Sequence, residues 1–158
     1  MSEQSIPIIK DEKTGSEVYV SKRILEQRYL IPISRIKDFF DNLKDGKVTA
    51  TKCKSCGTIY FPPKADCDRC MSSSMEYIEL KGEATLVSFT VVRVKPSTFS
   101  SFADYAVGIG RMAEGINILA WIDEDLSRIR IGAKMRLVVM SRKVDNTISY
   151  FFKILGHE

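Results

Sequence analysis

Four cysteines clustered in a short segment are the side chains of this sequence best suited to holding a metal ion. They form the pattern C-x2-C, ten residues, C-x2-C, and comprise Cys53, Cys56, Cys67 and Cys70. Two thiolates three positions apart converge on one ion when a tight turn between them points its backbone N–H groups at the sulfurs. Gly57 follows the first pair, where a positive φ closes such a turn without steric cost, and Met71 follows the second. We therefore predict a structural tetrathiolate site with zinc as the favoured ion.

Other interpretations of the cysteines are weaker. Two disulfides are disfavoured in a cytoplasmic setting. A redox iron site remains an alternative because the segment 56–60 is similar to one rubredoxin knuckle, although the second loop lacks the Pro and Gly that rubredoxins use. A zinc deaminase requires P-C-x-x-C and H-x-E, but Asp66 precedes Cys67 and the sequence contains no H-x-E. Because four cysteine ligands leave no open position for water, we expect the site to build structure and not to catalyse.

The histidine content excludes several enzyme classes. The single histidine, His157, lies next to the C-terminus of the sequence, and chain ends are usually frayed. Neither a Ser-His-Asp nor a Cys-His relay can therefore be built with a histidine from the folded body, and a zinc hydrolase with several histidine ligands is also excluded. We expect a protein without enzymatic activity of its own.

Length, composition and charge indicate an ordinary soluble protein. The 158 residues suffice for one medium domain or two small ones, and 44% of them are hydrophobic and 28% charged. The net charge of +4, from 24 basic and 20 acidic residues, is too small to indicate nucleic-acid binding by bulk electrostatics. Apolar runs are far shorter than the roughly 18–20 residues that span a bilayer, and residues 1–13 do not resemble a signal peptide. We expect a cytoplasmic protein without membrane association.

Helices are predicted in an N-terminal segment, residues 1–47. Residues 1–17 are polar and expected to be loosely held, and residues 21–30 could form a short helix that ends before Pro32.

A second helix is predicted from Ser34, which looks like an N-cap, to a C-terminal stop at Gly46. Its apolar residues recur at spacings of three, four and seven and comprise Ile36, Phe39, Phe40 and Leu43. This stripe is expected to pack against the rest of the chain, with a docking face for another protein as the alternative.

The cysteines lie in residues 48–80, which are typical of a rubredoxin-like zinc ribbon. Short strands are expected before the first knuckle, over residues 58–61 and over residues 75–80. Because so few residues cannot bury much apolar area, the metal must supply part of the folding free energy.

Residues 81–158 change to a period of two and predict a five-stranded barrel. The expected strands cover residues 87–91, 105–110, 116–122, 135–139 and 148–154. The break over residues 123–131 is polar enough for a turn or short helix. Five strands suggest a Greek-key barrel of the OB type, because an immunoglobulin-like sandwich needs about seven. Gly82, Gly108 and Gly110 are expected where strands bend to close the barrel.

The order of these parts resembles a known prokaryotic family, the zinc-ribbon plus OB-fold family long catalogued as a domain of unknown function. The resemblance covers about residues 35–155. It rests on an N-terminal helix, Gly46-Lys47, Cys53-x-x-Cys56-Gly57, Phe61-Pro62-Pro63, Cys67-x-x-Cys70, Gly82, Ser88-Phe89-Thr90 and Ile131-Gly132. Asp68 stands where the family often has Pro, and Met71 stands where it often has Gly.

The resemblance implies acyl-CoA handling in lipid metabolism. Such proteins are similar to the small subunits that accompany thiolases, hydroxymethylglutaryl-CoA synthase and thiolase-like aldolases. The small protein docks on the enzyme and helps to hold or channel the CoA thioester without catalytic machinery of its own. The implied partners are therefore a thiolase-type enzyme and acyl-CoA or CoA.

A CoA site needs cations for the phosphates and an apolar slot for the pantetheine and acyl parts. Residues 93–102, between the first two predicted strands of the barrel, offer both, and two further residues could lie on the same side. The candidate ligand residues are Arg93, Lys95, Phe99, Phe102, Arg111 and Trp121. The alternative is a solvated loop whose aromatic residues fold back on the core.

A single-stranded nucleic-acid-binding protein is the rival function, because zinc ribbons and OB barrels both occur in such proteins. Binding of that kind needs a basic groove with exposed aromatic residues on the middle strands. These strands offer Tyr105, Arg111 and Trp121 but no cluster of lysine or arginine. We therefore prefer the acyl-CoA accessory function and do not expect a nucleic-acid partner.

Overall fold

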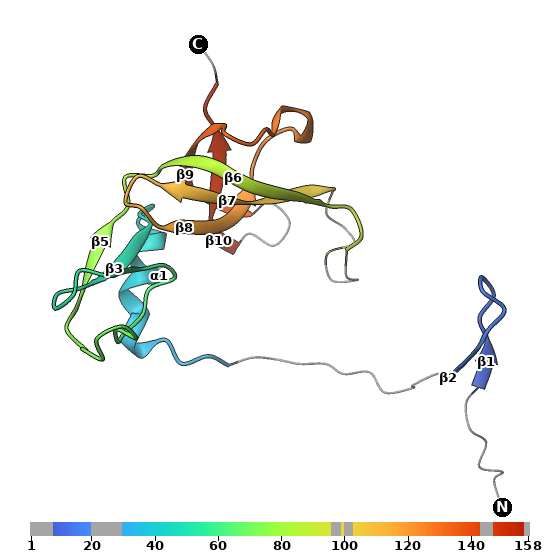
Figure 1. The fold of residues 1–158 in the computed structure, drawn as a ribbon, viewed down its shortest axis with the longest axis horizontal. Helices are drawn as coiled ribbons and strands as arrows, with labels where there is room; N and C mark the ends of the chain where they lie inside the picture. The colour runs from blue at the N-terminus through green and yellow to red at the C-terminus, as the bar shows by residue number, and fades with distance from the viewer. Residues whose placement is uncertain (1–7, 20–29, 96–98, 100–102, 143–146, 157–158) are drawn as a thin grey trace, which may run out of the picture. The chain divides into compact units, whose positions relative to one another are not determined.

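The computed structural model describes residues 8–19, 30–95, 99, 103–142 and 147–156 (Figure 1). The chain divides into two compact units, Met1–Pro32 and Ile33–Glu158. The predicted helix over residues 21–30 and the predicted ligand residue Phe102 lie outside the described residues, apart from Leu30, which is not helical. No helix among the described residues is both long and apolar enough to cross a membrane.

The first unit contains a β-hairpin that overlaps residues 1–17, the segment that the sequence predicts to be loosely held. Strands β1 (Ile8–Lys10) and β2 (Glu17–Tyr19) pair in antiparallel register. The turn between them is fixed by Asp11, whose carboxylate accepts hydrogen bonds from the backbone of Lys13 and Thr14. Gly15 completes the turn with φ of 70°, a conformation in which glycine carries no Cβ penalty.

The second unit begins with the predicted helix. A 3-10 turn, η1 (Ser34–Ile36), leads into α1 (Lys37–Lys44). Ser34 is not the N-cap that the sequence suggested, because the helix starts through the 3-10 turn and no side chain caps either element. At the other end, Gly46 with φ of 78° donates its N–H to the Leu43 carbonyl and ends the helix as predicted.

The ribbon follows as a three-stranded antiparallel sheet in the order β4-β3-β5. Its strands are β3 (Thr49–Cys53), β4 (Ile59–Tyr60) and β5 (Met75–Glu79). The central strand β3 carries Cys53 at its end and pairs along its full length with β5. The two cysteine loops therefore leave the sheet close together.

Five strands then close into a barrel with the order β10-β8-β7-β6-β9. They are β6 (Glu83–Val92), β7 (Tyr105–Met112), β8 (Asn117–Ile122), β9 (Lys134–Arg142) and β10 (Thr147–Ile154). Only the contact of β10 with β8 is parallel; the other pairs are antiparallel. The break between β8 and β9 holds the 3-10 turn η3 (Leu126–Arg128). The structure thus confirms the predicted zinc-ribbon region followed by a five-stranded OB fold.

The two predicted barrel glycines on β7 have a packing role. A Cβ on Gly108 would lie 2.7 Å from Ile122 Cδ1, and one on Gly110 would lie 2.5 Å from the Phe152 ring. Neither glycine has a positive φ. Both therefore make room for core side chains that cross the narrow barrel, which is a different reason from the strand bend that the sequence suggested.

Strand β6 changes its facing within its length. Its register with β7 shifts between Leu86 and Ser88, which is the signature of a β-bulge. Leu86 is buried, whereas Val87 is exposed. The period-two alternation predicted over residues 87–91 places Val87 on the same face as Phe89 and Val91, which is wrong because the extra residue turns the Val87 side chain outward.

Aromatic side chains join the ribbon to the barrel. Phe39 of α1 and Phe61 of the ribbon lie edge to face, with ring centroids 6.0 Å apart, and both also contact Tyr150 of β10. The predicted stripe on α1 is therefore an internal packing surface at Phe39 and Leu43, whereas Phe40 remains exposed.

Candidate functional site

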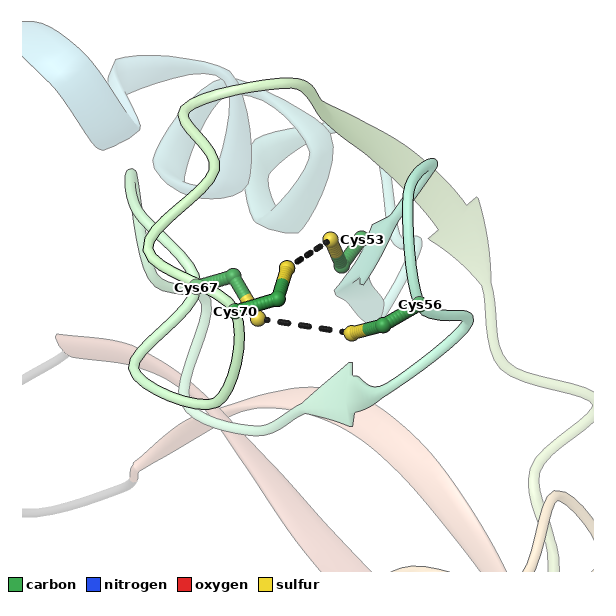
Figure 2. Close-up of side chains that lie close together, drawn as sticks. All are labelled: Cys53, Cys56, Cys67 and Cys70. Atoms are coloured by element: carbon green, nitrogen blue, oxygen red, sulfur yellow. Dashed lines mark hydrogen bonds between the residues drawn. The ribbon is translucent and has the colours of Figure 1, made fainter.

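The four cysteine sulfurs point toward a common centre from two loops, as Figure 2 shows. All four Sγ atoms lie within 4.8 Å of one another, and the Cys53–Cys70 and Cys56–Cys67 pairs are 3.5 Å apart. Four sulfurs placed about 2.3 Å from one tetrahedral ion would be separated by about 3.8 Å. The sulfurs are therefore arranged as the ligands of a single metal ion, and they use all four of its positions.

The two cysteine loops have the same backbone hydrogen bonds. Gly57 N–H donates to the Cys53 carbonyl at 2.8 Å, and Met71 N–H donates to the Cys67 carbonyl at 2.9 Å. The residue that follows the second cysteine of each pair has a positive φ, 75° at Gly57 and 59° at Met71. The second knuckle thus keeps the shape of the first even though a non-glycine residue occupies the left-handed position.

Polar neighbours of Cys56 and Cys67 favour the thiolate forms of these two side chains. The Tyr60 hydroxyl lies 3.2 Å from Cys67 Sγ, and this hydrogen bond lowers the pKa of the Cys67 thiol to about 6. The Thr58 hydroxyl, 3.2 Å from Cys56 Sγ, lowers the pKa of that thiol. A thiol with a lowered pKa is more often already deprotonated near neutral pH, so fewer protons must be released when it binds the metal ion.

A second set of contacts holds these neighbours in place. The Tyr60 hydroxyl also lies 2.6 Å from Asp68 Oδ1, a second acceptor for its single hydrogen, and Lys64 donates to the other oxygen of Asp68. Asp68, which stands where the resembled family often has Pro, therefore helps to position the Tyr60 hydroxyl. On the other flank, Arg35 forms a two-pronged ion pair with Asp66 at 2.7 and 2.8 Å, which ties the start of the helical segment to the second knuckle.

A second site lies on the barrel, away from the cysteines. A cavity of about 290 Å³ opens beside the end of β7 and β8. Tyr105 and Trp121 stack there with ring centroids 4.1 Å apart and planes inclined by 5°. The cavity is lined by apolar groups of Ile122, Leu126, Met140 and Phe151, and by Asp104, Asp123, Glu124 and Arg142.

The structure brings some of the predicted ligand residues together. Phe99 packs beside both Trp121 and Tyr105, at 6.2 and 6.5 Å between ring centroids. Lys95 and Arg93 both pair with Asp104, at 2.8 and 3.1 Å. The Lys95 side chain is only 13% exposed in this arrangement, whereas that of Arg93 is 72% exposed.

Arg111 is separated from this group. It lies near the opposite end of β7 and pairs in register with Thr85, while Tyr105 pairs with Val92. Arg111 lies six positions after Tyr105, a separation of roughly 20 Å along the strand. Arg111 therefore belongs to a different part of the barrel surface from Trp121.

Sequence reasoning missed several lining residues. Arg142 lies over the Trp121 ring at 5.7 Å, and Phe151 meets the same ring edge to face at 6.3 Å. Both come from strands remote in sequence that only barrel closure brings to Trp121. A partial signal existed for Phe151, because it interrupts the polar positions of an alternating strand.

Known proteins match both parts of the chain. The model of the ChsH2 rubredoxin-like zinc ribbon domain matches residues 40–76, and that of the ChsH2 C-terminal OB-fold domain matches residues 77–140. A DUF35 domain-containing scaffold protein of Methanothermobacter thermautotrophicus is 31% identical over 111 residues, covering 67% of this chain and 84% of the relative. The chain belongs to the DUF35 family. A further DUF35 scaffold protein, of Methanocaldococcus jannaschii, is 33% identical over 107 residues, 65% of this chain and 76% of the relative.

A solved structure has the same fold as this chain. The Ltp2-ChsH2(DUF35) aldolase superposes with a TM-score of 0.67, covering 80% of this chain and 98% of that chain at 21% identity. At this identity the likeness supports the shared fold. The predicted resemblance to a zinc-ribbon plus OB-fold family is confirmed, and the β1–β2 hairpin lies outside the residues that the two DUF35 domain models match.

Proposed function

We propose that this DUF35 chain is a non-catalytic accessory subunit that docks on a thiolase-type enzyme and helps to hold its acyl-CoA substrate. The observation that carries the proposal is the closed sulfur cage, because four sulfurs within 4.8 Å fill every position of a tetrahedral ion. The metal centre then has no place for a reacting water or substrate. The curated relatives are named scaffold proteins, which supports a binding function.

The metal is inferred to be zinc with a structural function. Four thiolates suit this soft-ligand site without redox consequences, and the matching domain model is described as a zinc ribbon. When bound, the ion cross-links two loops of a sheet too small to have a core of its own. One zinc per chain by elemental analysis of colourless protein supports the inference, and iron with visible absorbance in freshly isolated protein overturns it.

The Trp121 cavity is proposed to take the pantetheine and acyl parts of the ligand. Its acidic side chains are paired, Asp104 with Lys95 and Arg93, Glu124 with Arg128, and Asp123 with Lys153. A wall of apolar groups and neutralised ion pairs suits an uncharged chain with amide groups better than a phosphate. The exposed guanidinium of Arg93 is the group of this loop best placed to meet a charged end.

Tryptophan fluorescence tests ligand binding directly, because Trp121 is the single tryptophan of the chain. Titration with an acyl-CoA should change its emission with a saturable dependence. Phe99→Ala should weaken the response, whereas Phe40→Ala, which alters an exposed phenylalanine elsewhere, should leave it unchanged. A flat titration, or equal loss in both variants, would refute the assignment of this cavity.

Docking needs a separate test. Affinity capture of the zinc-loaded chain from native lysate, followed by mass spectrometry, should recover a thiolase-type enzyme. The pair should then form a defined complex when the two purified proteins are mixed and sedimented. Enzymatic turnover by the isolated chain would contradict the accessory function.

The rival nucleic-acid function keeps one supporting observation. The Tyr105–Trp121 stack lies on the second and third strands of the barrel, a surface on which OB folds bind oligonucleotides. A salt-dependent change in Trp121 emission with single-stranded DNA or RNA, absent with acyl-CoA, would favour that alternative.

A further inference from the structure

Basic side chains gather on the barrel surface at the end remote from Trp121. Arg111 of β7 and Lys134 of β9 lie on either side of Thr85 in β6, because Thr85 pairs in register with both. Arg136 lies two residues further along β9 and pairs with Glu83. Residues opposite each other on neighbouring strands are about 5 Å apart at Cβ, so Arg111, Thr85, Lys134 and Arg136 form one continuous surface, here called the cation patch.

The cations of this patch lack acidic partners among the described side chains. No described carboxylate lies within ion-pair distance of Arg111, Lys134 or Arg136. Other described cations without an ion pair, such as Lys52, Lys54 and Arg69, lie outside this patch, whereas Arg111, Lys134 and Arg136 lie together around Thr85. The patch is therefore a local excess of positive charge on a chain whose total net charge is only +4.

One contact of the patch opposes folding. Arg136 lies directly across from Lys153 in the antiparallel pair of β9 and β10, and like charges in that position destabilise a sheet. The weak pairing of Lys153 with Asp123, at 3.6 Å, and the carboxylate of Glu83, opposite Arg136 on β6, offset part of this repulsion. A surface that keeps an unfavourable pair of cations is well suited to an anion that neutralises them.

The patch also has the shape and the donors of a binding site. A cavity of about 390 Å³ is lined by Thr85, Arg111, Lys134 and Arg136, together with Glu83 and apolar groups. Lys134 Nζ donates to Thr85 Oγ1 at 3.0 Å, which leaves the hydroxyl hydrogen of Thr85 free to donate to a ligand. Two guanidinium groups supply paired N–H donors that match phosphate oxygens, and the ammonium adds a point charge.

We propose that the cation patch binds clustered phosphate groups of a small molecule, such as the diphosphate of a nucleotide. The ligand would bridge Arg111 and Lys134 over the Thr85 hydroxyl, with Arg136 at its flank. Three cations against the one carboxylate of Glu83 leave a surplus that a multiply charged phosphate neutralises. This site is distinct from the Trp121 cavity and does not rest on the proposed function.

Calorimetric titration of the zinc-loaded full chain with pyrophosphate, CoA and dephospho-CoA tests the proposal. Pyrophosphate should bind the wild-type chain, and Arg111→Gln with Lys134→Gln should weaken binding at least about tenfold through loss of two charge-assisted contacts. Thr85→Val should weaken it a few-fold. Lys10→Gln with Lys13→Gln, which removes the same two units of charge from the hairpin, should have no effect. Tighter binding of CoA than of dephospho-CoA would assign the 3′-phosphate to the patch, and equal binding would assign the diphosphate.

Two outcomes would overturn the proposal. One is no measurable binding of pyrophosphate by the wild-type chain, and the other is equal weakening by Lys10→Gln with Lys13→Gln, which indicates general charge attraction. Should the double variant fail to fold, amide chemical shifts of the wild-type chain decide instead: perturbation by pyrophosphate must centre on Thr85 and Lys134, and perturbation centred on Trp121 refutes the site. Phe99→Ala should leave pyrophosphate binding intact. An oligonucleotide that binds more tightly than pyrophosphate would replace the small ligand with nucleic acid.

Discussion

The left-handed conformation of Met71 predicts that a glycine at this position makes the metal centre more stable. A non-glycine residue in this region costs about 1–2 kcal/mol, and Met71 has φ of 59°. Its side chain is 83% exposed, so its removal sacrifices little buried area. Glycine carries a larger entropy loss on folding of about 0.5–1 kcal/mol. The net expectation for Met71→Gly is a stabilisation of about 0.5–1 kcal/mol. Because 1 kcal/mol shifts the Tm of a chain of this size by about 2–4 °C, the Tm should rise by about 1–4 °C.

Two companion variants separate the backbone effect from loss of the side chain. Met71→Ala keeps a Cβ in the same conformation and should leave the Tm nearly unchanged. Gly57→Ala introduces a Cβ at φ of 75°, with no atom within 4 Å of it, and should lower stability by about 1 kcal/mol through conformation alone. Thermal unfolding would be followed at fixed free zinc. A Met71→Gly variant that melts below Met71→Ala, or a neutral Gly57→Ala, would refute the equivalence of the two knuckles.

Three further expectations concern the cage, the barrel and the ligand cavity. Chelation, or Cys53→Ser, should remove the metal and lower the Tm, and unchanged melting of metal-free chain would show that the cage does not stabilise the fold. Gly110→Ala should cost about 1–3 kcal/mol in denaturant unfolding because its Cβ would lie 2.5 Å from Phe152, with part of the loss recovered by adding Phe152→Leu; a neutral single variant would contradict the packing. The Lys95 hydrogen bond holds the pKa of Asp104 below its usual range, so the pair stabilises the loop above about pH 3.9, the unfolded value, and is lost as pH falls through the lower folded pKa. Trp121 emission should change in that acid range, and Asp104→Asn should reproduce the change at neutral pH. If Asp104→Asn leaves the emission unchanged, the Lys95–Asp104 pair does not influence the cavity.

Local sequence signals predicted the elements of the ribbon and barrel well. Cysteine spacing identified the four ligands without knowledge of the fold, because a tetrathiolate site is built from two short turns whose geometry is local. Alternation with period two located the five barrel strands, since each has one face in the core. The N-terminal hairpin was missed because its strands have three residues each, too few for a periodic signal, although Asp11 and Gly15 mark its turn.

Which side chains meet on the barrel surface could not be predicted in the same way. Arg111 and Trp121 are close in sequence and lie on neighbouring strands, but the antiparallel register places Trp121 beside Val107 and Arg111 beside Asn117. The cation patch could not be predicted because its residues are far apart in the sequence. Thr85, which lies between Arg111 and Lys134 on the barrel, precedes Arg111 by 26 residues in the chain. Periodicity gives the face of each strand, whereas barrel closure determines which ends of the strands come together.

The filled interior of the barrel restricts where any ligand can bind. Phe152 is fully buried and its ring occupies the space over Gly110, while Ile122 and Leu86 occupy the space over Gly108. A five-stranded barrel packed in this way has no room for a ligand between its walls. Binding must therefore use the outer surface. The structure offers two sites there, at opposite ends of β7: the Trp121 cavity, whose acidic side chains are paired, and the cation patch. Uncharged and phosphorylated groups are thus expected to bind at separate places, so a variant at one site should leave the affinity of the other unchanged. Joint loss of both affinities in a folded variant would show that a single extended site covers both ends.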